Sequence, residues 1–146
     1  MRTPLIALAL LLSTQAFAQN LRLDCVAPKK SPVPGAASVR GNLKLTLIKE
    51  GDRNHRRGGT PGAYRAEGEL AVKLVSRPGT PPVVDKKIKF IGQYHNNDVA
   101  ETVSLASGRP EDPESILIFA MLNQQPSREN PSQVDYRDVQ YATQCK

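Results

Sequence analysis

The sequence predicts an all-β protein: a single small antiparallel β-barrel or β-sandwich of about seven strands, with its termini joined by a disulfide. Three observations indicate this fold. Apolar and polar residues alternate with period two along much of the chain, which is typical of strands with one packed face and one wet face. Twelve prolines and ten glycines divide the chain into short pieces. The two cysteines, Cys25 and Cys145, lie near opposite ends.

An export signal precedes the predicted domain. Arg2 gives the segment a positive start, residues 5–12 are apolar, and Ala16-Phe17-Ala18 has the small-x-small pattern of a cleavage site. The apolar run is too short to span a bilayer. We therefore expect a signal peptide over residues 1–18, a single β-rich domain over residues 19–146, and a periplasmic or extracellular protein. A buried N-terminal helix is the alternative.

The two cysteines are expected to pair, because exported compartments allow disulfides to form and persist. A link across 120 residues stabilises the fold by about 4–5 kcal/mol in the chain-entropy model. Two unpaired, buried thiols are the alternative. A disulfide removes both sulfurs from the candidate nucleophiles and metal ligands.

The expected strands follow one another with turn sequences between them. Their inward-facing residues are, in chain order, Leu21, Leu23 and Cys25; Leu43, Leu45 and Leu47; Tyr64, Ala66, Gly68, Leu70, Val72 and Leu74; Val84, Ile88, Phe90 and Tyr94; and Val99, Val103 and Leu105. Lys86 and Glu101 interrupt this inward phase. Residues 77–82, 95–98 and 108–113 fit short connections between strands, and residues 124–132 fit a longer loop.

Two segments near the C-terminus allow more than one interpretation. Residues 116–122 are apolar in both phases, which favours a strand covered on both sides, although the preceding Asp112-Pro113 also fits a helix start. Residues 134–145 change phase at Arg137-Asp138. We expect a β-bulge at this step, within one last strand.

A basic loop over residues 49–65 is the strongest functional candidate. Its five basic residues exceed its two acidic residues by three charges, and its glycines predict a hairpin tip. The predicted ligand- or partner-binding residues are Arg53, His55, Arg56, Arg57 and Arg65. Paired arginines can hold a phosphate, sulfate or carboxylate through forked hydrogen bonds. The alternative is a solvated loop that keeps the protein soluble. Nucleic acid is disfavoured because aromatic residues do not alternate with these charges.

The sequence gives little support to catalysis. His95 and Asp98 occur at close spacing, but a zinc site needs three or four ligands. Glu67 and Glu69 share one strand face, as expected for a wet sheet surface. Motifs for a serine nucleophile, for zinc or for a dinucleotide do not occur. We therefore expect no catalytic residue, no metal and no cofactor.

The expected function is an exported, non-catalytic binding domain: a ligand-binding, inhibitor or envelope accessory protein. An anionic ligand or an acidic protein surface is the expected partner, because the loop over residues 49–65 has an excess of three positive charges. A small-molecule carrier with a pocket inside the barrel is one alternative. A small secreted hydrolase that uses His55 or His95 is another. We do not expect the chain to span a membrane, because no later apolar run is long enough and aromatic residues are 5% of the total.

Overall fold

The computed structural model describes residues 19–31, 33–48, 63–96, 100–122 and 132–146. They form a closed, antiparallel barrel of eight strands in sequence order. The strands are β1 (Gln19–Val26), β2 (Ala36–Leu47), β3 (Ala63–Val75), β4 (Val84–Asn96), β5 (Glu101–Ala106), β6 (Ile116–Leu122), β7 (Ser132–Tyr136) and β8 (Val139–Cys145). The predicted all-β fold with a disulfide near both ends is therefore confirmed, with eight strands in place of about seven.

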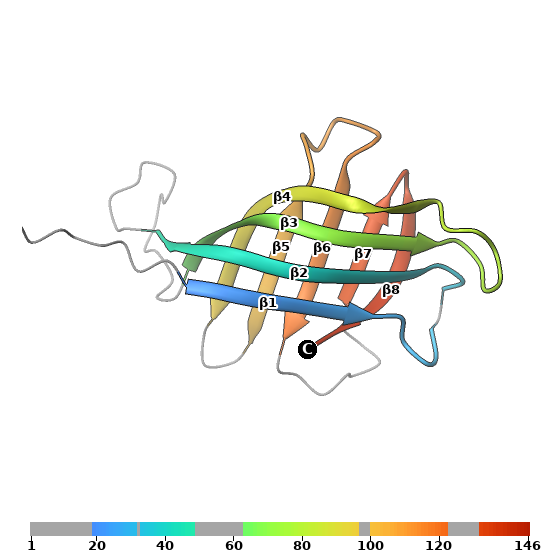
Figure 1. Cartoon of the computed structure of the whole chain (residues 1–146), viewed down its shortest axis with the longest axis horizontal. Coiled ribbons are helices and arrows are strands. Elements are labelled where there is room, and N and C mark those ends of the chain that lie inside the picture. Colours follow the sequence, from blue (N-terminus) through green and yellow to red (C-terminus); the bar gives the residue numbers. More distant parts are fainter. Residues whose placement is uncertain (1–18, 32, 49–62, 97–99, 123–131) are drawn as a thin grey trace, which may run out of the picture.

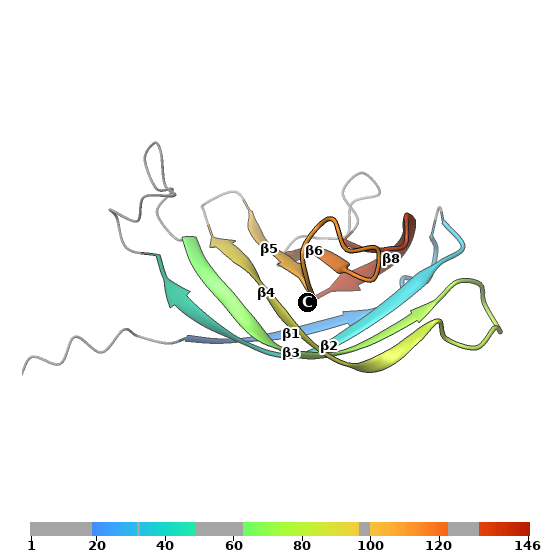
Figure 2. The same cartoon turned by 90° about the horizontal axis from the view of Figure 1, so that it is seen from above.

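The barrel is flattened into two crossing groups of strands. In Figure 1, β1 to β4 lie side by side as a long sheet, and β5 to β8 cross behind it at a steep angle. Figure 2 shows the long sheet bent into a trough, with the shorter strands across its concave side. Each strand pairs with the next along the chain, and β8 returns to pair with β1.

The predicted bulge at Arg137-Asp138 is wrong, and its correction accounts for the eighth strand. Tyr136 pairs with Val139, so the two residues between them form a tight hairpin turn. Both have positive φ, 50° for Arg137 and 60° for Asp138, as a type I′ turn requires. The turn was missed because its usual residues, Asn and Gly, are absent from this position.

The disulfide lies at the seam that closes the barrel. Cys25 and Cys145 are direct cross-strand partners and their sulfurs are bonded, which confirms the predicted link. The β1–β8 pairing covers only this pair and Val26–Gln144. Thr143 extends the seam because its hydroxyl lies 2.8 Å from the Ala37 carbonyl oxygen and 3.2 Å from that of Val26.

The inward-facing side chains of the strands pack into one hydrophobic core. Its large, fully buried side chains are Phe90, Leu23, Leu43, Leu70, Leu74, Ile118, Val39, Val72, Val103 and Val134. These residues belong to a single cluster that includes both cysteines. Period-two alternation therefore identified the buried face correctly on most of β1 to β5. Leu47, which was predicted to face inward at the end of β2, is 53% exposed. Lys86, which interrupts the phase, is exposed.

Residues Ile116–Leu122 form a strand, as favoured, but only one face of it is covered. Ile116, Ile118 and Ala120 are buried, whereas Leu117 and Phe119 are 39% and 40% exposed on the outer face. The expectation of a strand covered on both sides is wrong for the described residues.

Glycines on the inward phase let the long strands bend and approach their neighbours. A Cβ atom added to Gly92 would lie less than 3.0 Å from the backbone carbonyl oxygen of Ser104 on β5. A Cβ added to Gly68 would meet the backbone oxygen of Asn42 in the same way. Only glycine permits such close backbone approach, and the strands that carry these residues, β3 and β4, are visibly curved in Figure 2.

Candidate binding surfaces

Four of the five predicted binding residues, Arg53, His55, Arg56 and Arg57, lie outside the described residues. Their role stays a prediction. Arg65 lies on the outer face of β3, where it is exposed and its Nη2 is 3.9 Å from Oε2 of Glu67. An exposed pair at this distance holds the guanidinium weakly, so Arg65 can still contact a partner.

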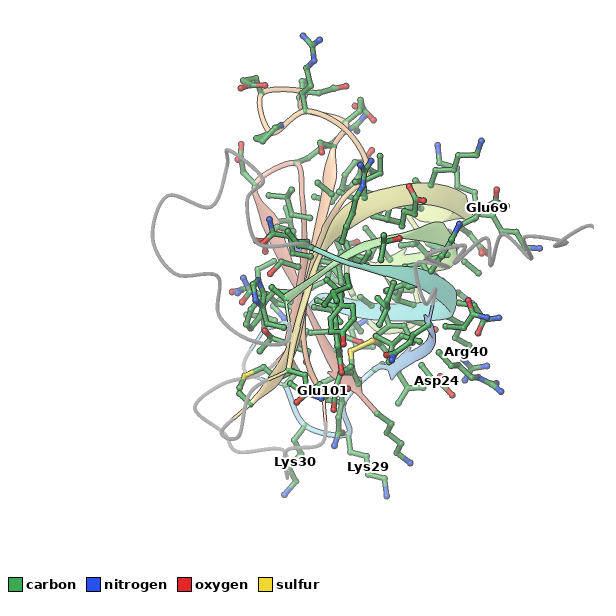
Figure 3. All side chains as sticks on the ribbon, turned by 90° about the vertical axis from the view of Figure 1, so that its left-hand side faces the viewer. Asp24, Lys29, Lys30, Arg40, Glu69 and Glu101 are labelled. Carbon is green, nitrogen blue, oxygen red and sulfur yellow. A yellow bond between two sulfur atoms is a disulfide. The ribbon has the colours of Figure 1, made fainter. Side chains whose placement is uncertain are left out.

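The outer face of β1 to β4 carries an excess of positive charge. Its outward-facing basic residues are Arg22, Arg40, Lys44, Arg65, Lys73, Lys87 and Lys89, against Asp24, Glu67, Glu69 and Asp85. Arg40 Nε lies 3.1 Å from Asp24 Oδ1, and Figure 3 shows these two side chains next to each other. Lys29 and Lys30, on the connection between β1 and β2, point away from the barrel in the same view. Basic side chains therefore outnumber acidic ones on this surface.

A shallow groove of about 490 Å³ crosses the outer face of β4, β5, β6 and β7. Its apolar walls are Ile91, Ala106, Leu117 and Phe119, and its polar rim is Gln93, His95, Ser104 and Asp135. The strand register builds the apolar wall, because Ile91 pairs with Ala106 and Ala106 pairs with Leu117. Three neighbouring strands thus place apolar side chains in one row on the surface.

The groove is exposed apolar surface on an otherwise polar face. Ile91 is 54% exposed, Phe119 40% and Leu117 39%. Apolar side chains gathered in this way and surrounded by polar groups mark contact sites for other molecules. Sequence reasoning missed the groove, although the apolar outward phase of residues 116–122 was its signal.

His95 lies at one end of the groove and is hydrogen-bonded to an amide side chain. Its Nε2 is 3.1 Å from Oε1 of Gln93, its neighbour on the same face of β4. In the part of the chain that the structure describes, no group of three or more His, Cys, Asp or Glu side chains could hold a metal ion. Gln93 can orient the imidazole, but these contacts place no nucleophile beside it, and a hydrolytic role for His95 stays an untested alternative.

A polar contact lies among inward-facing residues where β4 ends and β5 begins. The Tyr94 hydroxyl donates a hydrogen bond of 2.7 Å to Oε1 of Glu101, the residue that interrupts the inward phase of β5. The Tyr64 ring lies against Tyr94 at 5.7 Å between centroids, with a tilt of 56°. Burial and the hydrogen bond to Glu101 raise the pKa of Tyr94 to about 12. Glu101 thus satisfies the buried phenol and keeps it protonated.

The Tyr94 contact makes stability sensitive to alkaline pH. Because the pKa of Tyr94 is higher in the folded state than its model value of 10.0, its contribution is fully present below pH 10 and is lost as the pH rises towards 12. We expect the wild-type urea midpoint to fall across this window and that of Tyr94→Phe to fall less. Parallel curves for the two proteins would contradict the assignment.

A second polar cluster joins two connections at the opposite end of β4. Glu114, which precedes β6, accepts hydrogen bonds from the guanidinium of Arg137 and from the Tyr136 hydroxyl, the latter at 2.8 Å. Arg137 also lies over the Tyr136 ring, 5.2 Å from its centroid. The hydrogen bonds from Arg137 and then from Tyr136 lower the pKa of Glu114. The cluster holds the β7–β8 turn against the loop before β6, which is a structural role.

The described residues include no helix that is long and apolar enough to cross a membrane. No protein-family model, curated protein or solved structure matches the chain.

Proposed function

We propose that the protein is an exported, non-catalytic binding domain that captures an acidic protein through the groove on β4 to β7. The observation that carries the proposal is the row of exposed apolar side chains, Ile91, Leu117 and Phe119, held by rigid strands. Contact sites built on strands are fixed in shape before binding, which lowers the entropic cost of association.

The shape of the groove supports a protein partner over a small molecule. Small-molecule sites enclose most of their ligand, whereas this groove is shallow and lies on the outer wall of the barrel. The inward side chains form one buried cluster, so they occupy the space that a carrier would need for its ligand. The carrier alternative is therefore the weaker one.

The charge of the chain supports an acidic partner. The sequence has a formal net charge of +6 and a pI near 9.5, and the outward-facing basic residues of β1 to β4 outnumber the acidic ones. Opposite charges accelerate association and select partners. The arginines of residues 49–65 would add to the same attraction, as the sequence predicts.

The groove can be tested by placing a charge in its wall. We expect Leu117→Asp to reduce the recovery of captured proteins from envelope extract by about tenfold or more, because a carboxylate in a desolvated contact opposes apolar burial. The measurement is quantitative mass spectrometry of proteins held by the immobilised, oxidised domain. Raising the salt concentration should also reduce recovery.

Val139→Asp is the matched control, because Val139 is 45% exposed and lies outside the groove, at the start of β8. It should leave recovery unchanged. Equal recovery with wild type and Leu117→Asp would overturn the proposal for the groove. Alanine at Arg53, Arg56 and Arg57 tests the predicted basic loop separately.

A further inference from the structure

Among the described residues, β1 has a strand partner on only one side over most of its length. Residues Gln19–Cys25 pair with β2 on one side, but β8 meets β1 on the other side only at Cys25 and Val26. One further hydrogen bond, from Lys146 N to Asp24 O at 3.0 Å, extends the seam. Within the described ranges, no strand pairs with residues 19–23 on that side. In Figure 1, β8 approaches β1 only near the arrowhead of β1.

The backbone groups on this edge can be identified from the strand geometry. Along a strand, successive residues direct their N–H and C=O groups to alternate sides. The Asp24 carbonyl faces the β8 side, since it accepts the hydrogen bond from Lys146. Asn20 and Arg22 have the same parity as Asp24, so their N–H and C=O groups face this side as well. A row of backbone groups that none of the described strands pairs with is a template for an added strand.

The side chains beside the edge are basic. Arg22 is exposed on the outer face, and Lys44 is the cross-strand partner of Asn20. Asp24, the carboxylate of β1, is paired with Arg40. On the inner face, Leu23 is fully buried and Leu21 is partly buried against the core. An incoming strand thus meets positive charge on one face and apolar surface on the other.

We propose that the open edge of β1 accepts an extended, acidic segment of a second protein as an added strand, antiparallel to β1 in the line of β8. The residues of the added strand would alternate between two faces. Its apolar side chains would lie on the inner face beside Leu21 and Leu23, and its carboxylates would lie on the outer face beside Arg22 and Lys44. The acidic character of the partner rests on the proposed function. The surface itself is separate from the groove on β4 to β7.

The test uses a capped, fluorescent peptide of alternating glutamate and valine, about eight residues long, added to the purified, oxidised protein. We expect fluorescence anisotropy to show binding that weakens with salt, and at least tenfold weaker binding of the matched lysine–valine peptide. Asn20→Pro should weaken binding of the glutamate peptide by about tenfold, because proline removes one outward N–H and leaves the β1–β2 bonds in place. Far-UV circular dichroism checks that the variant is folded.

Other outcomes would overturn the inference. Unchanged affinity in folded Asn20→Pro, or preference for the lysine peptide, would exclude an acidic added strand. A dimer of the protein that Asn20→Pro dissociates would assign the edge to a second copy instead. If Asn20→Pro fails to fold, Arg22→Glu provides the test, since it leaves Lys44 as the only basic group named beside the edge and should abolish the preference for the glutamate peptide. Leu117→Asp should bind the peptide normally, so failure of the groove and failure of the edge are distinguishable.

Discussion

Alanine at position 92 is expected to lower the free energy of unfolding by about 3 kcal/mol, or to prevent folding altogether. The added Cβ would lie less than 3.0 Å from the Ser104 carbonyl oxygen and from Leu105 Cα. These are backbone atoms, so no side-chain rotation can make room. The β4–β5 ladder, in which Gly92 pairs with Leu105, would have to separate. Overpacking of this kind typically costs about 1–3 kcal/mol, and more where the backbone must move.

Urea unfolding followed by circular dichroism measures this effect, and Gly108→Ala is the matched control. Gly108 is exposed, and the nearest atom to its added Cβ is Ser115 Oγ at 3.8 Å, an ordinary contact. We expect Gly108→Ala to change stability by less than about 0.5 kcal/mol. Similar midpoints for Gly92→Ala and wild type would contradict the close approach of β4 and β5.

The fold could be predicted from the sequence because most of its information is local. Alternation depends on neighbouring residues, and it correctly assigned the buried phase of residues such as Leu43, Leu70 and Phe90. The disulfide followed from two cysteines, each in phase with the apolar residues of its own strand. The disulfide predicted that the first and last strands meet, but this was compatible with a barrel or a sandwich, and the strand pairing of the structure shows the barrel.

The strand count depended on one turn with unusual residues. Two consecutive non-glycine residues, Arg137 and Asp138, adopt positive φ, which costs free energy for L-amino acids. The side chain of Arg137 is hydrogen-bonded to Glu114, 23 residues away in sequence, which holds the turn in place. The turn propensities of neighbouring residues do not report a contact this far away in sequence. The phase change was therefore interpreted as a bulge.

The groove could not be predicted from the sequence because it depends on the register in which β4, β5 and β6 pair. Ile91, Ala106 and Leu117 are separated along the chain and become neighbours only when three strands pair in one alignment. A run of basic residues such as 53–57 is visible in a sequence, whereas a cross-strand row is not. The apolar outward phase of Leu117 and Phe119 was visible, but it is equally typical of a strand buried on both faces.

Reduction of the disulfide is expected to lower the free energy of unfolding by about 4 kcal/mol. The bond between Cys25 and Cys145 closes a loop of 120 residues. Without the bond the unfolded chain gains conformational entropy, which lowers its free energy by about 4–5 kcal/mol. Besides the disulfide, the seam has two β1–β8 residue pairs, one β2–β8 pair and a few hydrogen bonds from Thr143 and Lys146. We expect a lower urea midpoint and a melting temperature lower by on the order of 15 °C.

The comparison that isolates this bond is oxidised against reduced wild-type protein, with Cys25→Ala/Cys145→Ala as the control. Reductant should leave the double variant unaffected, since it has no disulfide to break, so any general effect of the reagent becomes visible there. Both cysteines are buried, Cys25 completely and Cys145 with 8% exposed, so reduction must be carried out on the unfolded chain before refolding. Equal midpoints for the oxidised and reduced proteins would show that the barrel is held closed by its core and seam hydrogen bonds alone, and the role assigned to the disulfide would then be wrong.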